Sequence, residues 1–157
     1  MVIEGVEIRV ITPNYTGSGK FLFNLYNEID GFKYKPPVDL LLVDYSHGSR
    51  GGNHFHKGKN PNKNPERWIV VAGTLELIAV NWLGQKMNEI IKAEKNAKPL
   101  VSIKSDVYHI NVPRQSGLVI AEFIMEPFDP NDDTYYGEKA FYEYTSEKYG
   151  KGIHVGI

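Results

Sequence analysis

The chain has no cysteine, which excludes a disulfide framework, a thiolate nucleophile and a cysteine-based zinc site. It also has no excess of charge of either sign, because 18 Lys and Arg residues stand against 19 Asp and Glu residues. A balanced chain offers no electrostatic reason to bind nucleic acid or an anionic membrane. We therefore expect neither of these partners.

Long apolar runs are absent as well, since no segment approaches the length that crosses a bilayer. The first residues, MVIEGVEIRVITPNY, mix acidic with apolar side chains, unlike a signal peptide. We expect a soluble cytoplasmic protein. The 157 residues are enough for one domain with a core and too few for two ordinary domains, so we expect a single domain over residues 1–157.

Short strand-like segments separated by turns fill most of the sequence, and its ten Tyr and seven Phe residues suit a β-rich core. Segments 38–45 and 118–125 are apolar runs typical of buried strands. The composition of segment 87–97 favours helix, but the regular spacing of its neighbours favours strand, and we predict strand. The other expected strands are 2–11, 21–26, the run after Glu66, 75–82, 99–103 and 107–112. The pattern predicts an all-β sandwich or barrel, with a short helix at 138–149.

Two histidines one residue apart stand at the centre of the sequence. In a strand, His54 and His56 would point to the same face, with Phe55 on the other face. Two imidazoles on one face form half of a metal site, and Glu66 can add an oxygen ligand from the next strand. His109 stands alone on a later strand and is the candidate fourth ligand.

The spacing around these residues resembles the first motif of the cupin family, in which an H-x-H pair and a glutamate lie between two glycines. Five residues separate Gly48 from His54, and six separate Glu66 from Gly73, as in that motif. The nine residues between His56 and Glu66 are more than usual, and a surface loop tolerates such an insertion at small cost. His109 fits the histidine of the second cupin motif, although the proline and glycine before it and the asparagine after it are missing. The resemblance implies a double-stranded β-helix, the cupin jelly roll.

Within the cupins, the segments RGGNHFHK and FDPNDDTYY resemble sugar-nucleotide enzymes of polysaccharide biosynthesis, notably the C-terminal cupin domain of capsular polysaccharide reductase/epimerases. The similarity to dTDP-4-dehydrorhamnose epimerases is more distant. Those enzymes work without a metal and have glutamine and lysine where this chain has His56 and Glu66. Their catalytic tyrosine would fall near Glu122. This exchange implies a metal-binding relative in which His54, His56, Glu66 and His109 hold a divalent ion, with zinc preferred over iron, manganese or nickel.

The resemblance implies an isomerase or epimerase that moves a proton alpha to the carbonyl of a nucleotide-linked keto-sugar. If a metal binds, His54 is a ligand and the proton carrier is another residue, for which Tyr108 and Tyr142 are the candidates. If no metal binds, His54 is the base. Arg50, Lys57 and Asn53 are the candidate substrate-binding residues, since an arginine and a lysine can hold a diphosphate.

Two other functions fit the same motif. One is a different metal-dependent cupin chemistry, such as that of an iron oxygenase, and the other is a sugar-binding module without catalysis. A homodimer formed through edge strands is expected from the resemblance.

Overall fold

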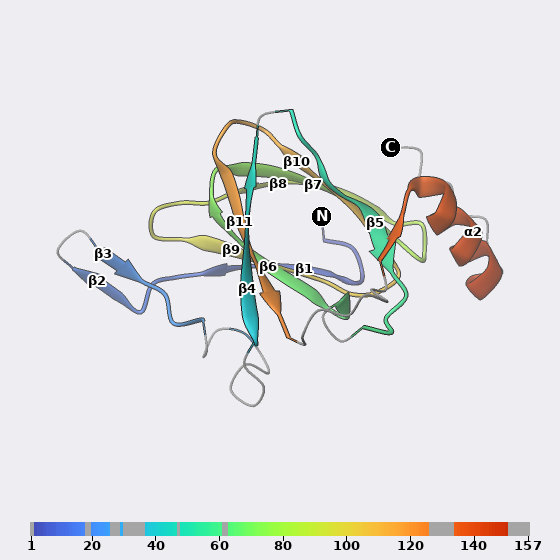
Figure 1. The fold of residues 1–157 in the computed structure, drawn as a ribbon, viewed down its shortest axis with the longest axis horizontal. Helices are drawn as coiled ribbons and strands as arrows, with labels where there is room; N and C mark the ends of the chain where they lie inside the picture. The colour runs from blue at the N-terminus through green and yellow to red at the C-terminus, as the bar shows by residue number, and fades with distance from the viewer. Residues whose placement is uncertain are drawn as a thin grey trace.

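Two antiparallel five-stranded sheets face each other in the computed structural model, which describes residues 2–17, 20–25, 29, 37–46, 48–60, 63–125 and 134–150 (Figure 1). The first sheet has the order β1-β9-β6-β11-β4 and the second the order β12-β5-β10-β7-β8. Their strands are β1 (Val6–Ile11), β4 (Asp39–Tyr45), β5 (Gly51–His56), β6 (Glu66–Ala72), β7 (Thr74–Asn81), β8 (Lys86–Lys92), β9 (Lys98–Ile103), β10 (Val107–Pro113), β11 (Leu118–Ile124) and β12 (Thr134–Tyr136). A hairpin of β2 (Tyr15–Gly17) and β3 (Lys20–Leu22) projects from one end, and helix α2 (Glu138–Tyr149) lies at the other (Figure 1).

The main core lies between the two sheets. Alternate residues of each strand point inward, and Trp68, Leu77, Val101 and Leu118 are almost fully buried there. The period-two alternation of the strands therefore sends one set of side chains into this space and the other set to the outer faces.

A second apolar cluster fills the space between the outer face of the second sheet and helix α2. Phe55 from β5 and Tyr108 from β10 pack against Phe141 of the helix. The helix ends at Gly150, which adopts the left-handed conformation and donates its backbone N–H to the Ser146 carbonyl. Burial of Phe141 fixes the helix on this sheet, opposite the side that faces the first sheet.

A third cluster covers part of the outer face of the first sheet. Ile11, Ile69, Leu100 and Phe123 form it, with Ile29 packed over them. The first sheet is therefore apolar on both faces near its centre, which is why residues 118–124 read as one nearly continuous apolar run.

Most of the expected strands are confirmed, including a strand in the ambiguous segment 87–97, where β8 ends at Lys92. The first strand begins at Val6, and the expected strand 21–26 ends at Leu22 as far as the structure describes it. The prediction that segment 38–45 is a buried strand is wrong: β4 is a strand, but Leu40, Leu41 and Leu42 are exposed because β4 is the edge of its sheet.

The C-terminal helix is confirmed at Glu138–Tyr149. Of the FDPNDDTYY segment, only the last three residues, which form β12, lie within the described part of the chain. None of the described helices has the length and apolar character needed to cross a bilayer.

Candidate metal centre

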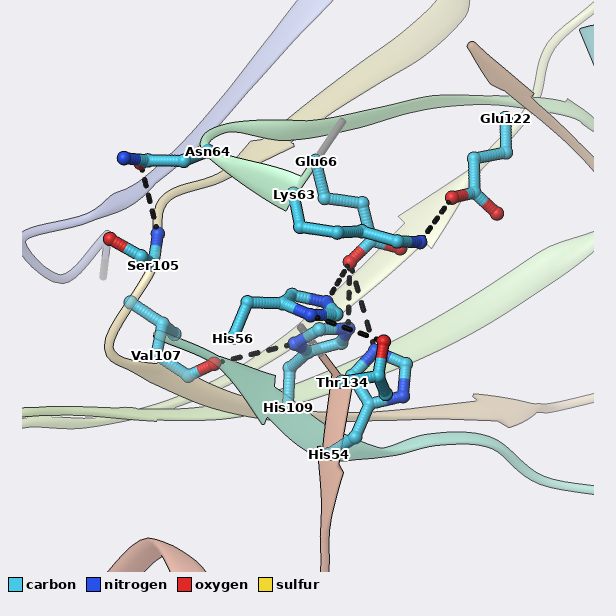
Figure 2. Close-up of polar contacts among 10 residues, drawn as sticks. All are labelled: His54, His56, Lys63, Asn64, Glu66, Ser105, Val107, His109, Glu122 and Thr134. Carbon is cyan, nitrogen blue, oxygen red and sulfur yellow. Dashed lines mark hydrogen bonds and ion pairs between the residues drawn. The ribbon is translucent and has the colours of Figure 1, made fainter. Parts of the chain in front are cut away.

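Three histidines from the second sheet meet one carboxylate from the first. His54 and His56 point inward from β5, and His109 lies directly opposite His54 on the neighbouring strand β10. Glu66, the first residue of β6, faces them across the interior (Figure 2). Its Oε2 lies 2.8 Å from His56 Nε2 and 3.7 Å from the Nε2 atoms of both His54 and His109. The structure thus brings together all four residues that the sequence proposed as ligands.

An irregularity in β5 sets the position of His54. The pairing of β5 with β10 shifts by one residue between His109 and Ile110, and Gly52 there has a positive φ of 70°. A Cβ atom on Gly52 would lie 2.7 Å from the His109 carbonyl oxygen, closer than packing allows. Only glycine lets the two strands approach closely enough to hold His54 against His109.

The imidazole of His109 is oriented by its own strand. Its Nδ1 lies 3.5 Å from the Val107 carbonyl oxygen, to which it can donate, so that Nε2 faces Glu66 (Figure 2). Burial is the main cause that lowers the pKa of His109 to about 3, so this imidazole is neutral. A neutral Nε2 then presents a lone pair to a carboxylate oxygen, which is also an acceptor.

Glu66 is ionised despite its burial. Burial by itself raises the pKa of a carboxyl group, but hydrogen bonding with His54 and His56, together with the nearby Lys63 ammonium, holds the pKa of Glu66 well below its ordinary value. The neutral imidazole of His109 and the ionised carboxylate of Glu66 are in the protonation states that metal ligands need.

These residues fit a divalent metal ion. Within the described part of the chain, His54 Nε2 and His109 Nε2 are buried and have no hydrogen-bond partner. A cation between these nitrogens and Glu66 would satisfy them together. His54, His56 and Glu66 could hold such an ion by themselves, because their ligand atoms lie within 4.8 Å of one another. His109 would add a fourth ligand atom, because its Nε2 lies 3.7 Å from the same oxygen of Glu66.

The centre opens into a small cavity of about 90 Å³ between the sheets. Glu122 of β11 and Lys63 of the loop before β6 line it, and Lys63 Nζ lies 2.8 Å from Glu122 Oε1 (Figure 2). Burial, then the charge of Glu66, raises the pKa of Glu122 against the opposing effect of Lys63. Tyr45 of β4 also lines the cavity, and burial raises the pKa of its phenol. The cavity therefore holds a carboxylate of increased basicity, an ammonium group and a neutral phenol.

The two tyrosines proposed as proton carriers lie elsewhere. Tyr108 points from the opposite face of β10 into the cluster under helix α2, where its hydroxyl donates to Asn53 Oδ1. Tyr142 is on helix α2 itself. The second sheet separates both phenols from the histidines, because successive residues of a strand face opposite ways.

The proposed substrate-binding residues are also outside the cavity. The Lys57 ammonium lies 3.9 Å from the ring centroid of Tyr135, on the outer side of β5 with Phe55. Arg50 is exposed at the start of β5 and is not among the described residues that line the cavity. Asn53 occupies the irregularity of β5, and its carbonyl accepts a hydrogen bond from the Gly137 backbone N–H.

Sequence reasoning missed Lys63 and Tyr45, and it assigned no role to Glu122. A carboxylate in the middle of the apolar run LVIAEFIM is a signal that could have identified Glu122. No local signal marks Lys63, because it belongs to the inserted loop. Its position depends on contacts distant in sequence: the Asn64 side chain accepts a hydrogen bond from the Ser105 backbone N–H.

Two facing antiparallel five-stranded sheets form a cupin-like sandwich in this chain, with the histidines and Glu66 between the sheets. No family model matches the sequence, and no curated protein matches it significantly. Comparison with solved structures is more informative, because it matches the fold over nearly the whole chain.

The sugar 3,4-ketoisomerase QdtA from Thermoanaerobacterium thermosaccharolyticum, in complex with TDP, has a TM-score of 0.67 at 12% identity. That match covers 94% of this chain and 99% of QdtA. ChmJ, a 3'-monoepimerase from Streptomyces bikiniensis in complex with dTDP-quinovose, has the same TM-score and identity, with coverage of 98% of this chain and 79% of ChmJ. The epimerase RmlC from Legionella pneumophila, in complex with dTDP-4-keto-L-rhamnose, has a TM-score of 0.59 at 17% identity over 82% of this chain and 71% of RmlC. The chain is thus similar in structure to sugar-nucleotide cupins.

Proposed function

We propose that this protein is an isomerase or epimerase that moves a proton alpha to the carbonyl group of a nucleotide-linked keto-sugar. The observation that carries the proposal is the joint lining of one cavity by a metal-ligating group and the Lys63–Glu122 pair. The similarity in fold to ketoisomerases and epimerases supports it.

The reaction needs a base for the proton, a positive group for the enolate oxygen and an acid that returns a proton. Glu122 is the base, because its raised pKa makes it more basic than an ordinary carboxylate. It removes the proton from the carbon beside the carbonyl group; the electron pair of that C–H bond forms a carbon–carbon double bond, and the π pair of the carbonyl group moves to the oxygen. The Lys63 ammonium stabilises the resulting enolate. Protonated Glu122 or the Tyr45 phenol then gives a proton back to carbon.

The metal-ligating group complements these residues. Three imidazoles and one carboxylate suit zinc among the divalent ions. Such an ion would act as a Lewis acid on the carbonyl oxygen. His54 would then be a ligand, and proton transfer would rest with Glu122 and Tyr45, whose side chains reach the cavity.

The size of the cavity indicates which part of the substrate enters it. At about 90 Å³ it is smaller than a typical ligand pocket of roughly 300–1,000 Å³. The reacting part of the sugar would occupy the cavity while the nucleotide lies outside it. Lys63 would exchange its contact with Glu122 for one with the carbonyl oxygen, which releases the carboxylate to act as a base.

Incubation of the protein with a panel of nucleotide 4-keto-sugars in deuterated water tests the reaction. Deuterium should enter the substrate at the carbon beside the carbonyl group, and an isomer should form. The proposal fails if neither occurs with any member of the panel. Oxygen consumption by the iron-loaded protein, without isomer formation, would instead establish an oxygenase.

Elemental analysis tests the metal separately. The purified protein should carry about one divalent ion per chain, and His54→Ala should lose it. A wild-type protein that stays empty after metal is added would return His54 to the role of base.

We also propose that two copies pair through their exposed edge strands. In the first sheet, β4 is an edge strand on which Leu40, Leu41 and Leu42 are exposed, with Leu41 on the opposite face from Leu40 and Leu42. Pairing of two such edges would bury this apolar surface and satisfy its unpaired backbone groups. Light scattering should give twice the chain mass for the wild type and the chain mass for Leu41→Lys; a monomeric wild type would contradict the pairing.

A further inference from the structure

A larger cavity lies on the outer face of the first sheet, away from the metal centre. Its volume is about 380 Å³, within the range of small-molecule sites. Strands β1, β9 and β6 form its floor, and Pro65 and Ile29 contribute to its walls. The residues that line it are Gly5, Val6, Glu7, Arg9, Ile29, Pro65, Arg67, Leu100, Ser102 and Lys104.

The strand register places polar side chains together on the floor of this cavity. Glu7, Ser102 and Arg67 lie in one row across the three strands, and Arg9 lies beside Leu100 in the next row. All of them belong to the outward-facing set, since their strand neighbours are buried in the main core. Arg9 and Arg67 therefore lie on either side of β9 and point to the same side of the sheet.

Cationic side chains outnumber carboxylates among the described residues that line the cavity. Arg9, Arg67 and Lys104 contribute three cations against the single carboxylate of Glu7, whereas the whole chain has a net charge of −1. Arg9 is half-buried, and among the described residues neither Arg9 nor Lys104 makes an ion pair. The backbone N–H of Lys104 donates to the Gly5 carbonyl, which holds the lysine at the end of the row.

An apolar wall adjoins these charges. Leu100 and Ile29 belong to the outer cluster and reach the cavity, and Pro65 adds a further apolar surface. Arg9 and Lys104 are two cations that can meet the charge of a phosphate monoester, which is about −1.5 to −2 at neutral pH. Arginine suits phosphate oxygens because its planar fork can donate two hydrogen bonds at once. The volume exceeds what a bare phosphate needs and leaves room for an organic group against the apolar wall.

We propose that this cavity binds a small organic phosphate, with the phosphate held by Arg9, Arg67 and Lys104 and the organic group packed on Leu100 and Pro65. This second site goes beyond the proposed reaction. Glu66 and Arg67 are successive residues of β6 and face opposite ways, so the two sites lie on opposite faces of the first sheet. A ligand bound in the outer cavity therefore does not enter the inner cavity.

Calorimetric titration of the full chain at low ionic strength, with phenyl phosphate as the probe, tests the site. Arg9→Gln should weaken binding about tenfold, as expected when one charge-assisted hydrogen bond worth about 1.4 kcal/mol is lost. Glu7→Gln should tighten binding several-fold, because it removes the one negative charge. Benzoate, with a single negative charge and the same ring, should bind about tenfold more weakly than phenyl phosphate.

Two matched variants show where the probe binds. Arg50→Gln makes the same change of charge at the exposed start of β5. His54→Ala weakens the candidate metal centre, where a bound metal ion could itself attract phosphate. Both variants should bind phenyl phosphate with the affinity of the wild type. The proposal is overturned if the wild type does not bind phenyl phosphate, if Arg9→Gln binds it like the wild type, or if His54→Ala abolishes binding. Glu7→Gln keeps the test informative if an arginine variant folds poorly, since a gain in affinity cannot come from misfolding.

Discussion

The two faces of strand β6 form two different sites from adjacent residues. On the inner face, Glu66 meets three histidines beside a cavity of about 90 Å³. On the outer face, Arg67 lines a cavity of about 380 Å³ with two other cations. The inner site is buried and places two unpaired imidazole nitrogens beside a carboxylate, whereas the outer cavity is lined mainly by charged side chains on the face of the sheet. Strand alternation thus separates the candidate metal centre from the outer cavity by the thickness of one sheet.

Removal of the proposed base should have the largest effect. Glu122→Gln keeps the shape of the side chain but cannot accept the proton, so we expect kcat to fall by about 1,000-fold. Measurement of deuterium incorporation and isomer formation checks this. Lys139→Gln, on the exposed surface of helix α2, is the control and should react like the wild type. An active Glu122→Gln variant would assign the proton transfer to another residue.

Carboxylates on opposite faces of the first sheet should differ in their effect on metal binding. Glu66→Gln removes an anionic ligand, and we expect metal affinity to fall by more than about 100-fold, since even loss of an outer partner of a ligand costs about 10–100-fold. Glu7→Gln, on the outer face, should leave metal affinity unchanged. Competition with a zinc-binding dye measures both constants. Equal losses in the two variants would contradict the separation of the sites.

Glycine at the irregularity of β5 should be essential to the geometry of the inner site. Gly52→Ala combines a positive φ with a Cβ atom placed 2.7 Å from the His109 carbonyl, and we expect it to lower the free energy of unfolding by about 2–3 kcal/mol.

Gly117→Ala is the matched control for this substitution, because Gly117 also has a positive φ but has no atom within 4 Å of its Cβ position. It should cost only about 1 kcal/mol. Urea denaturation compares the two variants, and equal losses would show that the close approach of β5 and β10 is unimportant.

Acid should destabilise the metal-free protein through the inner site. The pKa of His109 is about 3 in the folded state and about 6.5 in the unfolded state, so between these values the unfolded state binds more protons. The contribution of His109 is complete above pH 6.5 and is lost as pH falls toward 3, by about 1.4 kcal/mol per pH unit. The lowered pKa of Glu66 acts in the same direction at more acidic pH.

Unfolding measured at several pH values checks this dependence. His109→Asn should reduce the slope between pH 6.5 and 4.5, whereas Lys139→Gln should not. A slope that does not change in His109→Asn would mean that another group carries the acid sensitivity.

Local patterns were sufficient to select the four residues that meet in the candidate metal centre. The i, i+2 spacing of His54 and His56 placed them on one strand face, and the resemblance to the first cupin motif implied the role of Glu66 and the fold. The period of the strands and the boundaries of the C-terminal helix also followed from local sequence, because alternation and helix propensity act over a few residues.

Tertiary structure alone decided which other groups share the cavity. Tyr108 is next to His109 in sequence, yet it faces helix α2, because a strand turns adjacent side chains to opposite sides. Glu122, Lys63 and Tyr45 come together from β11, an inserted loop and an edge strand, and no local pattern relates them. The exposure of Leu40 to Leu42 likewise depends on the place of β4 at the edge of its sheet. The sequence by itself determined the ligand-type residues and the strand faces that carry them, whereas the order and packing of the strands decided which other groups line the inner cavity and where the outer cavity lies. The physical reason is that side-chain direction is a local property of the backbone, while proximity between strands depends on the folding of the whole chain.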